Sequence, residues 1–220
     1  MELPSGRVWG VEVLLRWRSP QGELIPAREV VQIAEHRRLV LAMDRVVMRK
    51  ACTFLAGLPA SSGLRVGVNI SVRHLATGEL AGAVAECLAD SAIPANALWL
   101  ELKEGEYLAR DEARRALAEV RALSVHIAID DFGSGFFSLS RLRDLPVDRL
   151  KIDSDFTRDI DADRRGQALV AAVVDLGHAF GLDVLAEGVE GQGQLQTLSG
   201  LGCDLGQGVL DARSRRGPAA

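Results

Sequence analysis

The chain has 220 residues, of which 48% are apolar and 25% are charged, as is ordinary for a globular protein. Global disorder is excluded, because a chain with this apolar content and this small net charge can bury a core. Lysine and arginine number 26 against 30 acidic residues, and the formal net charge of −4 argues against a nucleic acid polymer as partner. A small phosphorylated ligand held by a few local groups is compatible with this charge.

The cysteines and the N-terminal residues indicate in which cellular compartment the protein is expected. The chain has an odd number of cysteines, and they lie far apart in the sequence, at Cys52, Cys87 and Cys203. Neither a disulfide scaffold nor a zinc knuckle is therefore expected. No apolar run reaches the roughly 18 residues of a membrane span. The first seven residues lack the apolar region of a signal peptide. We therefore expect a cytoplasmic protein without a membrane span, unless the chain is cut from a larger membrane-tethered protein.

Short apolar runs alternate with segments of helical period along the chain. The strand-like runs are Trp9–Trp17, Leu64–Ile70, Leu98–Leu102, Val125–Ile129, Arg149–Ile152, Asp183–Ala186 and, weakly, Cys203–Leu210. The predicted helices are Ala27–Arg38, Asp44–Ala56, Gly78–Asp90, Asp111–Leu123 and Arg165–Phe180. Several strand-like runs are apolar on both faces, as parallel strands covered on both sides are.

This alternation predicts one α/β domain with a parallel sheet over residues 1–212, followed by a loose polar tail over 213–220. Seven strand-like runs are one fewer than an eight-stranded barrel needs. Either a strand is missing, or the sheet is open, or the chain is a fragment.

Polar side chains follow one predicted strand after another, at the point where each strand ends. This placement is typical of a barrel enzyme with its active site at the C-terminal ends of the strands. The set comprises Glu12 and Arg16 on one face of the first run, then Asn69, Glu101, Asp130, Asp131, Lys151, Asp153, Glu187 and Gln207. Each residue alone is also explained as a strand-terminal polar group that meets solvent.

The carboxylates of this set favour a divalent cation. Clustered carboxylates repel one another, and divalent cations relieve that repulsion. A ligand set made only of oxygen atoms suits Mg²⁺ or Mn²⁺ rather than zinc. The adjacent Asp130 and Asp131 can bridge two ions, the usual arrangement for in-line attack on a phosphodiester. Lys151 and Arg16 supply positive charge for phosphate oxygens or a developing oxyanion.

Eight short motifs follow one another between residues 10 and 208. They are EVLLRW (Glu12–Trp17), PAREVVQIAE (Pro26–Glu35), VNIS (Val68–Ser71), LELKE (Leu100–Glu104), DDFGSGFFSLSRL (Asp130–Leu142), LPVDRLKID (Leu145–Asp153), AEGVE (Ala186–Glu190) and GCDLGQG (Gly202–Gly208). Their order and spacing resemble those of the EAL family of cyclic di-GMP phosphodiesterases. The family's naming tripeptide reads EVL here, with Val13 in place of alanine.

The resemblance implies a TIM-type (β/α)8 barrel of the EAL kind. It implies metal-dependent hydrolysis of cyclic di-GMP to linear pGpG, by in-line attack of an activated water with two divalent ions, Mg²⁺ or Mn²⁺. The implied ligands of the first ion are Glu12, Asn69, Glu101 and Asp130, and the group around the second is Asp130, Asp131 and Glu187. Lys151 and Glu187 are the implied catalytic residues, Lys151 at the nucleophilic water and Glu187 as a general base or only a ligand.

The resemblance also implies roles outside the metal ligands. Arg16 resembles the arginine that contacts a phosphate, and Gln207 resembles a glutamine near the metal centre. Asp153 is placed with them in the substrate-binding group. Glu104 resembles the glutamate that anchors the loop after the two aspartates. Family members often dimerise, so a homodimer is the assembly that the resemblance suggests beside the ligand cyclic di-GMP.

Several departures from the family's pattern favour a different function. Lys103 stands where the family has threonine, and this cation is expected to crowd the site or pair with Glu104. Phe136 and Phe137 alter the loop after the aspartates, and Val209 replaces a tyrosine. The family's first helix and strand have no counterpart before Glu12, so we also expect lower stability than that of a complete barrel.

Three functions therefore stay open at this point. A phosphodiesterase is favoured because every matched acidic, amide and lysine position is kept. The departures favour a catalytically weak or inactive EAL-like module that binds cyclic di-GMP or a protein partner. A third reading is another Mg²⁺-dependent barrel enzyme that acts on a phosphorylated metabolite.

Overall fold

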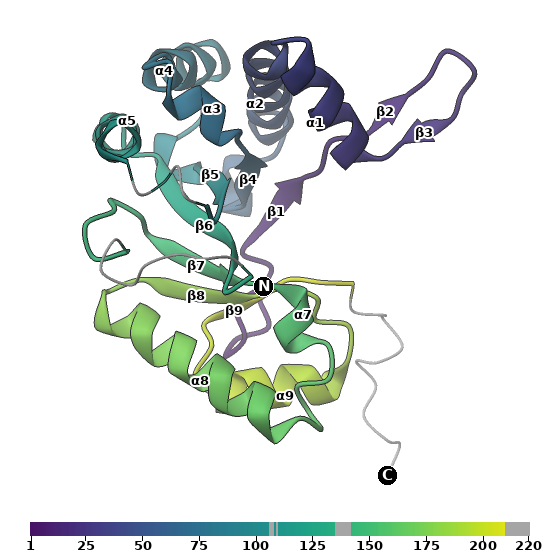
Figure 1. The fold of residues 1–220 in the computed structure, drawn as a ribbon, viewed down its shortest axis with the longest axis vertical. Helices are drawn as coiled ribbons and strands as arrows, with labels where there is room; N and C mark the ends of the chain where they lie inside the picture. The colour runs from purple at the N-terminus through teal and green to yellow at the C-terminus, as the bar shows by residue number, and fades with distance from the viewer. Residues whose placement is uncertain (106–107, 109, 135–141, 210–220) are drawn as a thin grey trace. The chain divides into compact units, whose positions relative to one another are not determined.

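Parallel strands and helices alternate along the chain, as the sequence pattern predicts. The computed structural model describes residues 1–105, 108, 110–134 and 142–209 (Figure 1). Two compact units share these residues. The N-terminal unit holds residues 10–102 and 107–127, and the C-terminal unit holds residues 1–9, 103–106 and 128–220. Each unit is described by itself.

The strands of the N-terminal unit run parallel in the order β1-β4-β5. Their bounds are Gly10–Val13 for β1, Arg65–Asn69 for β4 and Leu98–Lys103 for β5, whose last residue, Lys103, belongs to the C-terminal unit. The register places Glu12 beside Gly67 and Asn69 beside Glu101. Polar residues of three neighbouring strands are thereby brought to the same end of this part of the sheet.

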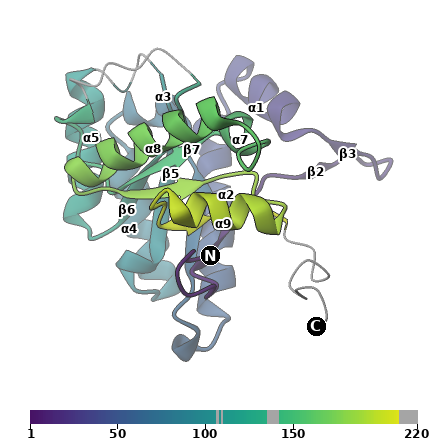
Figure 2. The ribbon, with the colours of Figure 1, turned by 90° about the horizontal axis from the view of Figure 1, so that it is seen from below.

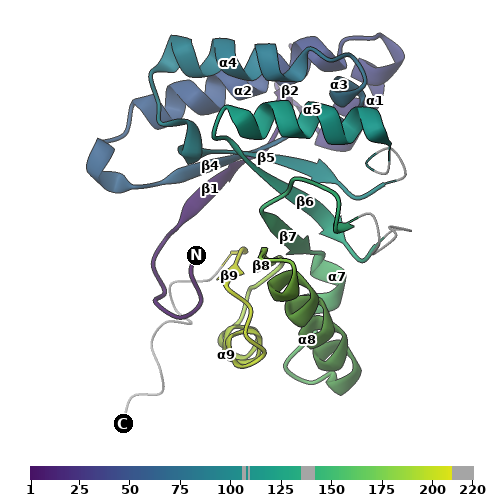
Figure 3. The ribbon, with the colours of Figure 1, turned by 90° about the vertical axis from the view of Figure 1, so that its left-hand side faces the viewer.

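Helices cover these strands in a layer. They are α1 (Ala27–His36), α2 (Val40–Ala56), α3 (Val72–Leu75), α4 (Leu80–Ser91) and α5 (Asp111–Ala122). Figure 3 shows α2, α4 and α5 side by side over β4 and β5, and α2 contacts both α4 and β4. The buried face of α5 carries Ala113, Ala116, Leu117 and Val120, which recur at helical spacing. Acidic residues in its first turn complement the helix dipole.

The first predicted strand run, Trp9–Trp17, is divided in the structure. Strand β1 ends at Val13, and Trp17–Arg18 form β2, which pairs antiparallel with β3 (Leu24–Ile25). Gly22 takes a φ of +90° in the turn between β2 and β3, a conformation that favours glycine. Two 3₁₀ turns, η1 (Ala60–Ser62) and η2 (Ala95–Ala97), precede β4 and β5.

The strands of the C-terminal unit run parallel in the order β6-β7-β8-β9. Their bounds are His126–Phe132 for β6, Arg149–Ile152 for β7, Asp183–Ala186 for β8 and Leu205–Gly206 for β9. The helices are α7 (Ser154–Thr157), α8 (Arg164–Ala179) and α9 (Gln192–Gly200) (Figure 2). A buried cluster joins α8, β8 and α9 through Val174, Val184 and Leu198.

Residues Met1–Leu3 pair with β9. Glu2 and Leu205 form an antiparallel bridge, and the Gly206 amide donates to the Met1 carbonyl at 2.9 Å. Leu3 enters the buried cluster of the C-terminal unit. The edge of β9 is therefore covered by these first residues. Among the described residues, no helix combines the length and apolar character that crossing a membrane requires.

Candidate functional site

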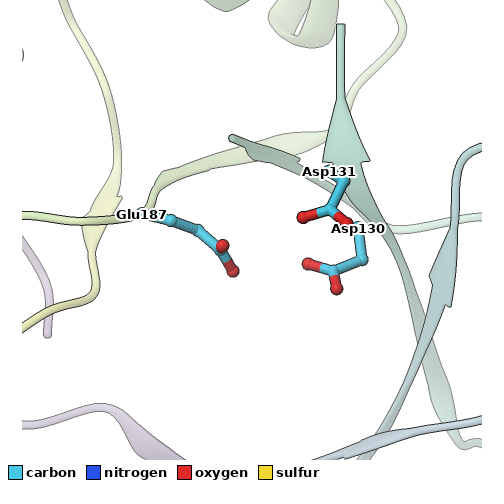
Figure 4. A group of neighbouring side chains, drawn as sticks. All are labelled: Asp130, Asp131 and Glu187. Atoms are coloured by element: carbon cyan, nitrogen blue, oxygen red, sulfur yellow. The ribbon is translucent and has the colours of Figure 1, made fainter. Parts of the chain in front are cut away.

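Three carboxylates of the C-terminal unit converge at the ends of its strands. Asp130 and Asp131 lie at the end of β6, and Glu187 directly follows β8. Each offers an oxygen atom, and these oxygens lie within 4.8 Å of one another. Figure 4 shows the three side chains turned toward a common point. We call Asp130, Asp131 and Glu187 the acidic triad.

Lys151 lies on β7, between the strands that carry the acidic triad. Its side chain is 1% exposed, and its Nζ lies 2.8 Å from Asp130 Oδ1 and 2.6 Å from Glu187 Oε1. A buried ammonium is tolerated only when paired, and here two carboxylates pair with it. The alternation along β7 turns Leu150 and Ile152 away from this point, into the core. Lys151 thus holds two members of the triad in place.

Lys103 is a second ammonium beside the acidic triad. Its Nζ lies 2.5 Å from Asp131 Oδ2, so it pairs with Asp131 and not with Glu104 as one sequence-based expectation had it. The hydrogen bond to Asp131 raises the pKa of Lys103, burial opposes this rise as the second largest effect, and the charges of Asp131, Asp130 and Glu187 raise the pKa further. The side chain nevertheless remains 69% exposed.

The turn after the triad's aspartates has a distorted backbone. Asp131 has a φ of +54°, and the register of β6 against β7 shifts between Ile129 and Phe132. Glu104 accepts a hydrogen bond from the Gly133 amide at 2.7 Å, and its own amide donates to the Asp130 carbonyl at 2.9 Å. Glu104 thus contacts both Asp130 and the turn that follows the two aspartates. Residues 135–141, which include Phe136 and Phe137, lie outside the described residues.

A second group of oxygen donors lies in the N-terminal unit. Asn69 donates from its side-chain amide to a carboxylate oxygen of Glu12, and it lies beside Glu101 in the β4–β5 register. A Cβ atom at Gly67 would overlap Glu101 Oε1, so the absence of a side chain there makes room for this carboxylate. Glu12, Asn69 and Glu101 therefore lie on adjacent strands, and we call them the strand-end group.

The residues predicted to bind substrate show other contacts. Arg16 is exposed and donates to the neighbouring Leu15 carbonyl at 2.8 Å. Asp153 caps α7 by accepting from the Asp155 amide at 2.8 Å, a contact that accounts for an aspartate at this position without a ligand. The backbone of Gln207 bonds to Ala186 and Val189 and thereby continues the sheet past β9. The predicted set thus divides between the units, with the strand-end group in one and the acidic triad with Lys151 in the other.

A buried polar pair, absent from the sequence analysis, supports the turn after Asn69. Asp44 of α2 lies 3.2 Å from His74 Nδ1, and both side chains are buried. Asp44 also accepts from the Ser71 amide at 3.2 Å, and Ser71 caps α3. An aspartate at an apolar position of a helical pattern is the sequence signal that would have indicated this pair.

A second network, also absent from the sequence analysis, holds the turn after Glu187. The Thr157 hydroxyl donates to the Glu187 carbonyl. The Gln194 side chain accepts from the amides of Glu190 and Gly191, both at 2.8 Å, and donates to the Thr157 carbonyl at 2.9 Å. These contacts from α7 and α9 fix the backbone that carries a member of the acidic triad.

The acidic triad fits a hard divalent cation. All of its donor atoms are carboxylate oxygens, which Mg²⁺ and Mn²⁺ prefer. Asp130 Oδ1 is buried and lies at ion-pair distance from Lys151, yet within the described residues it receives no hydrogen bond of suitable direction. A bound cation would satisfy this oxygen.

Comparison with known proteins gives consistent matches. The family model of the EAL domain matches residues 1–214. The cyclic di-GMP phosphodiesterase PA2567 of Pseudomonas aeruginosa is 36% identical over 216 residues, which are 97% of this chain and 37% of that protein. Eight of the curated relatives similar to this chain are longer, and the chain spans between 25% and 37% of their length.

Solved structures are also similar. The PaMucR phosphodiesterase in complex with c-di-GMP has a TM-score of 0.84 and 34% identity, over 93% of this chain and 84% of that one. The calcium and cyclic di-GMP complex of Klebsiella pneumoniae BlrP1 has a TM-score of 0.81 and 30% identity, over 94% of this chain and 52% of that one. These similarities confirm the predicted α/β fold of parallel strands and covering helices.

Proposed function

Since the chain belongs to the EAL domain family, we propose that it hydrolyses cyclic di-GMP to linear pGpG with two divalent ions, Mg²⁺ or Mn²⁺. The observation that carries this proposal is the acidic triad around the buried Lys151. The similar structure of Klebsiella pneumoniae BlrP1, solved with calcium and cyclic di-GMP, supports the choice of ligand and of a divalent ion.

Two groups of oxygen donors are available for the ions. We assign one ion to the acidic triad and the other to the strand-end group, Glu12, Asn69 and Glu101. Divalent ions, when bound, lower the pKa of water and neutralise the charge that develops on a phosphate. The chain's own residues then have to hold the donors, orient the water and accept its proton.

Lys151 and Glu187 are the proposed catalytic residues. The Lys151 ammonium is fixed by its pairing with two carboxylates. From this position it donates a hydrogen bond to the attacking water and orients it. Glu187 is 20% exposed, and we assign to it the acceptance of the water's proton. The new phosphorus–oxygen bond replaces the bond to the leaving ribose oxygen, which takes up a proton.

The remaining predicted residues are assigned to the substrate and to the loop. We place the exposed guanidinium of Arg16 and the Gln207 side chain on the nucleotide. Glu104 holds the start of the loop after the triad through the Gly133 amide. Asp153 is retained in the substrate-binding group as a proposal, beside its role as the cap of α7.

A second candidate function is that of an EAL module that binds cyclic di-GMP, or a protein partner, with little or no turnover. The pairing of Lys103 with Asp131 favours it, because this ammonium occupies a carboxylate of the triad that would hold a divalent ion. Turnover of cyclic di-GMP separates the two candidates, whether the module binds this nucleotide or a protein partner.

The test is incubation of the protein with cyclic di-GMP and Mn²⁺, with the products separated by chromatography. We expect pGpG from the wild type and none from Glu187→Gln, which keeps the size of the side chain and removes its charge. Absence of pGpG from the wild type contradicts the enzymatic proposal. Binding of cyclic di-GMP by calorimetry in that same sample would then support the second candidate.

A further inference from the structure

Lys103 lies at a position that affects how the acidic triad takes up a cation. We propose that Lys103 is a built-in counter-ion that competes with the divalent ion for Asp131 and thereby sets the metal affinity of the triad. This inference rests on the proposed function, because it takes the triad to be a metal site.

The geometry places the competition at one carboxylate. Lys103 Nζ lies 2.5 Å from Asp131 Oδ2, while Asp131 also offers an oxygen to the common point of the triad. A divalent ion that ligates Asp131 draws on the same carboxylate and repels the ammonium beside it. The ion and the ammonium therefore compete for this carboxylate.

The charges of the triad give the same result. Two of the triad's three carboxylates hold Lys151, which is 1% exposed, so this lysine cannot leave without burying unpaired charge. When only Lys151 is paired with the triad, the three carboxylates and this ammonium together carry a net negative charge that one divalent ion neutralises. With Lys103 bound as well, a divalent ion would leave excess positive charge. Lys103 is the lysine that has to move.

The backbone keeps Lys103 close to Asp131 while its side chain is free to leave. The neighbouring Glu104 bonds to the Asp130 carbonyl and to the Gly133 amide, so residue 103 is held against the end of β6. This tether gives the ammonium a high effective concentration at Asp131. The Lys103 side chain is 69% exposed, so it loses few packing contacts when its ammonium leaves Asp131 for water.

The experiment is a titration of the protein with Mn²⁺ in the absence of nucleotide, with free Mn²⁺ measured by electron paramagnetic resonance. Lys103→Met removes the charge and keeps the length of the stem. We expect it to lower the Kd of the Asp131-dependent ion about tenfold, as removing a like charge at this distance does. Lys50→Met is the matched control, because Lys50 is an exposed lysine of α2 in the other unit, and we expect no change.

Asp131→Asn tests whether the effect operates through Asp131. In the Asp131→Asn background, Lys103→Met is expected to have no effect on Mn²⁺ binding. An unchanged Kd in Lys103→Met, or a tightening that persists in the Asp131→Asn background, overturns the inference. Hydrolysis of cyclic di-GMP at saturating Mn²⁺ is measured separately. If the wild type shows no turnover, the enzymatic proposal is contradicted. If Lys103→Met nevertheless binds Mn²⁺ more tightly than the wild type does, this inference is supported.

Discussion

Two lysines contact the acidic triad in different ways. Lys151 is buried and shared by Asp130 and Glu187, whereas Lys103 is largely exposed and bound to Asp131. A surface ion pair contributes little to stability, but removing one partner of a buried pair leaves uncompensated charge. We therefore expect substitution of Lys151 to lower stability, and substitution of Lys103 to change the metal affinity with little effect on stability.

We expect Lys151→Met to lower the free energy of unfolding by about 3 kcal/mol in metal-free buffer, because two carboxylates lose their buried partner. Urea unfolding followed by circular dichroism measures this loss. Lys50→Met, an exposed lysine exchanged in the same way, is expected to be neutral. A loss below about 1 kcal/mol in Lys151→Met would show that the buried pair contributes little to stability.

Because two cysteine thiols are buried, we expect the stability of the protein to fall at alkaline pH. Burial raises the pKa of Cys52 to about 11 and that of Cys203 to about 12, from an ordinary value of 9.0. Both stay protonated in the folded chain at pH values where they ionise in the unfolded chain. Their contribution is therefore complete below about pH 9 and is lost as the pH rises toward those values.

We expect the free energy of unfolding to fall by about 1 kcal/mol per thiol between pH 8 and pH 10. Urea midpoints across this range measure the fall. Cys203→Ala removes one titrating group, so its stability should decline less steeply with pH than that of the wild type. Equal slopes for the two proteins would show that Cys203 does not contribute.

At the scale of elements, the turn from β4 into α3 depends on a side chain of α2. Asp44 accepts from the Ser71 amide and pairs with His74, and both partners are buried or half-buried. We expect Asp44→Ala to cost about 2 kcal/mol of stability, because these donors lose their acceptor. Urea unfolding again provides the measurement.

The control for Asp44→Ala is Asp90→Ala, which changes an exposed aspartate of α4. If the two variants lose the same stability, the buried pair is not what supports the turn. Mn²⁺ binding by the strand-end group should weaken in Asp44→Ala alone, because the supported turn directly follows Asn69.

The sequence predicted strands better than it predicted the segments that support the site. Each of the seven strand-like runs holds a parallel strand, since strands covered on both faces are rich in apolar residues. Helix α9 was missed because QGQLQTLSG has few apolar residues and a glycine in its first turn. It is stabilised by tertiary contacts, with Leu198 in the core and Gln194 bonded to the turn after Glu187.

Helix α2 begins at Val40, four residues before the predicted start at Asp44. Asp44 resembles a helix cap in the sequence, whereas in the structure it is a buried acceptor inside the helix. The acidic triad could be placed from the chain alone because strand ends meet at one edge of a sheet. The partner of Lys103 could not, since a long side chain reaches several neighbours and only the register selects among them.

At the scale of the whole molecule, residues near the two ends of the described chain stabilise each other. Leu3 enters the buried cluster with Val184 and Leu198, while Met1 and Glu2 pair with β9. We expect Leu3→Ala to cost about 2 kcal/mol of stability and to speed hydrogen exchange at the Gly206 amide, which bonds to Met1. Val8→Ala, an exposed apolar residue in the same segment, is the control. Unchanged exchange at Gly206 in Leu3→Ala would contradict a stabilising role for this pairing.

Gly67 makes the strand-end group sensitive to a single methyl group. A side chain at this position overlaps the Glu101 carboxylate, so Gly67→Ala displaces a donor while every acidic and amide residue stays in the chain. Loss of function by this route would leave the full set of family motif residues intact. An EAL domain can therefore be silenced by a substitution that a search for missing acidic residues does not detect.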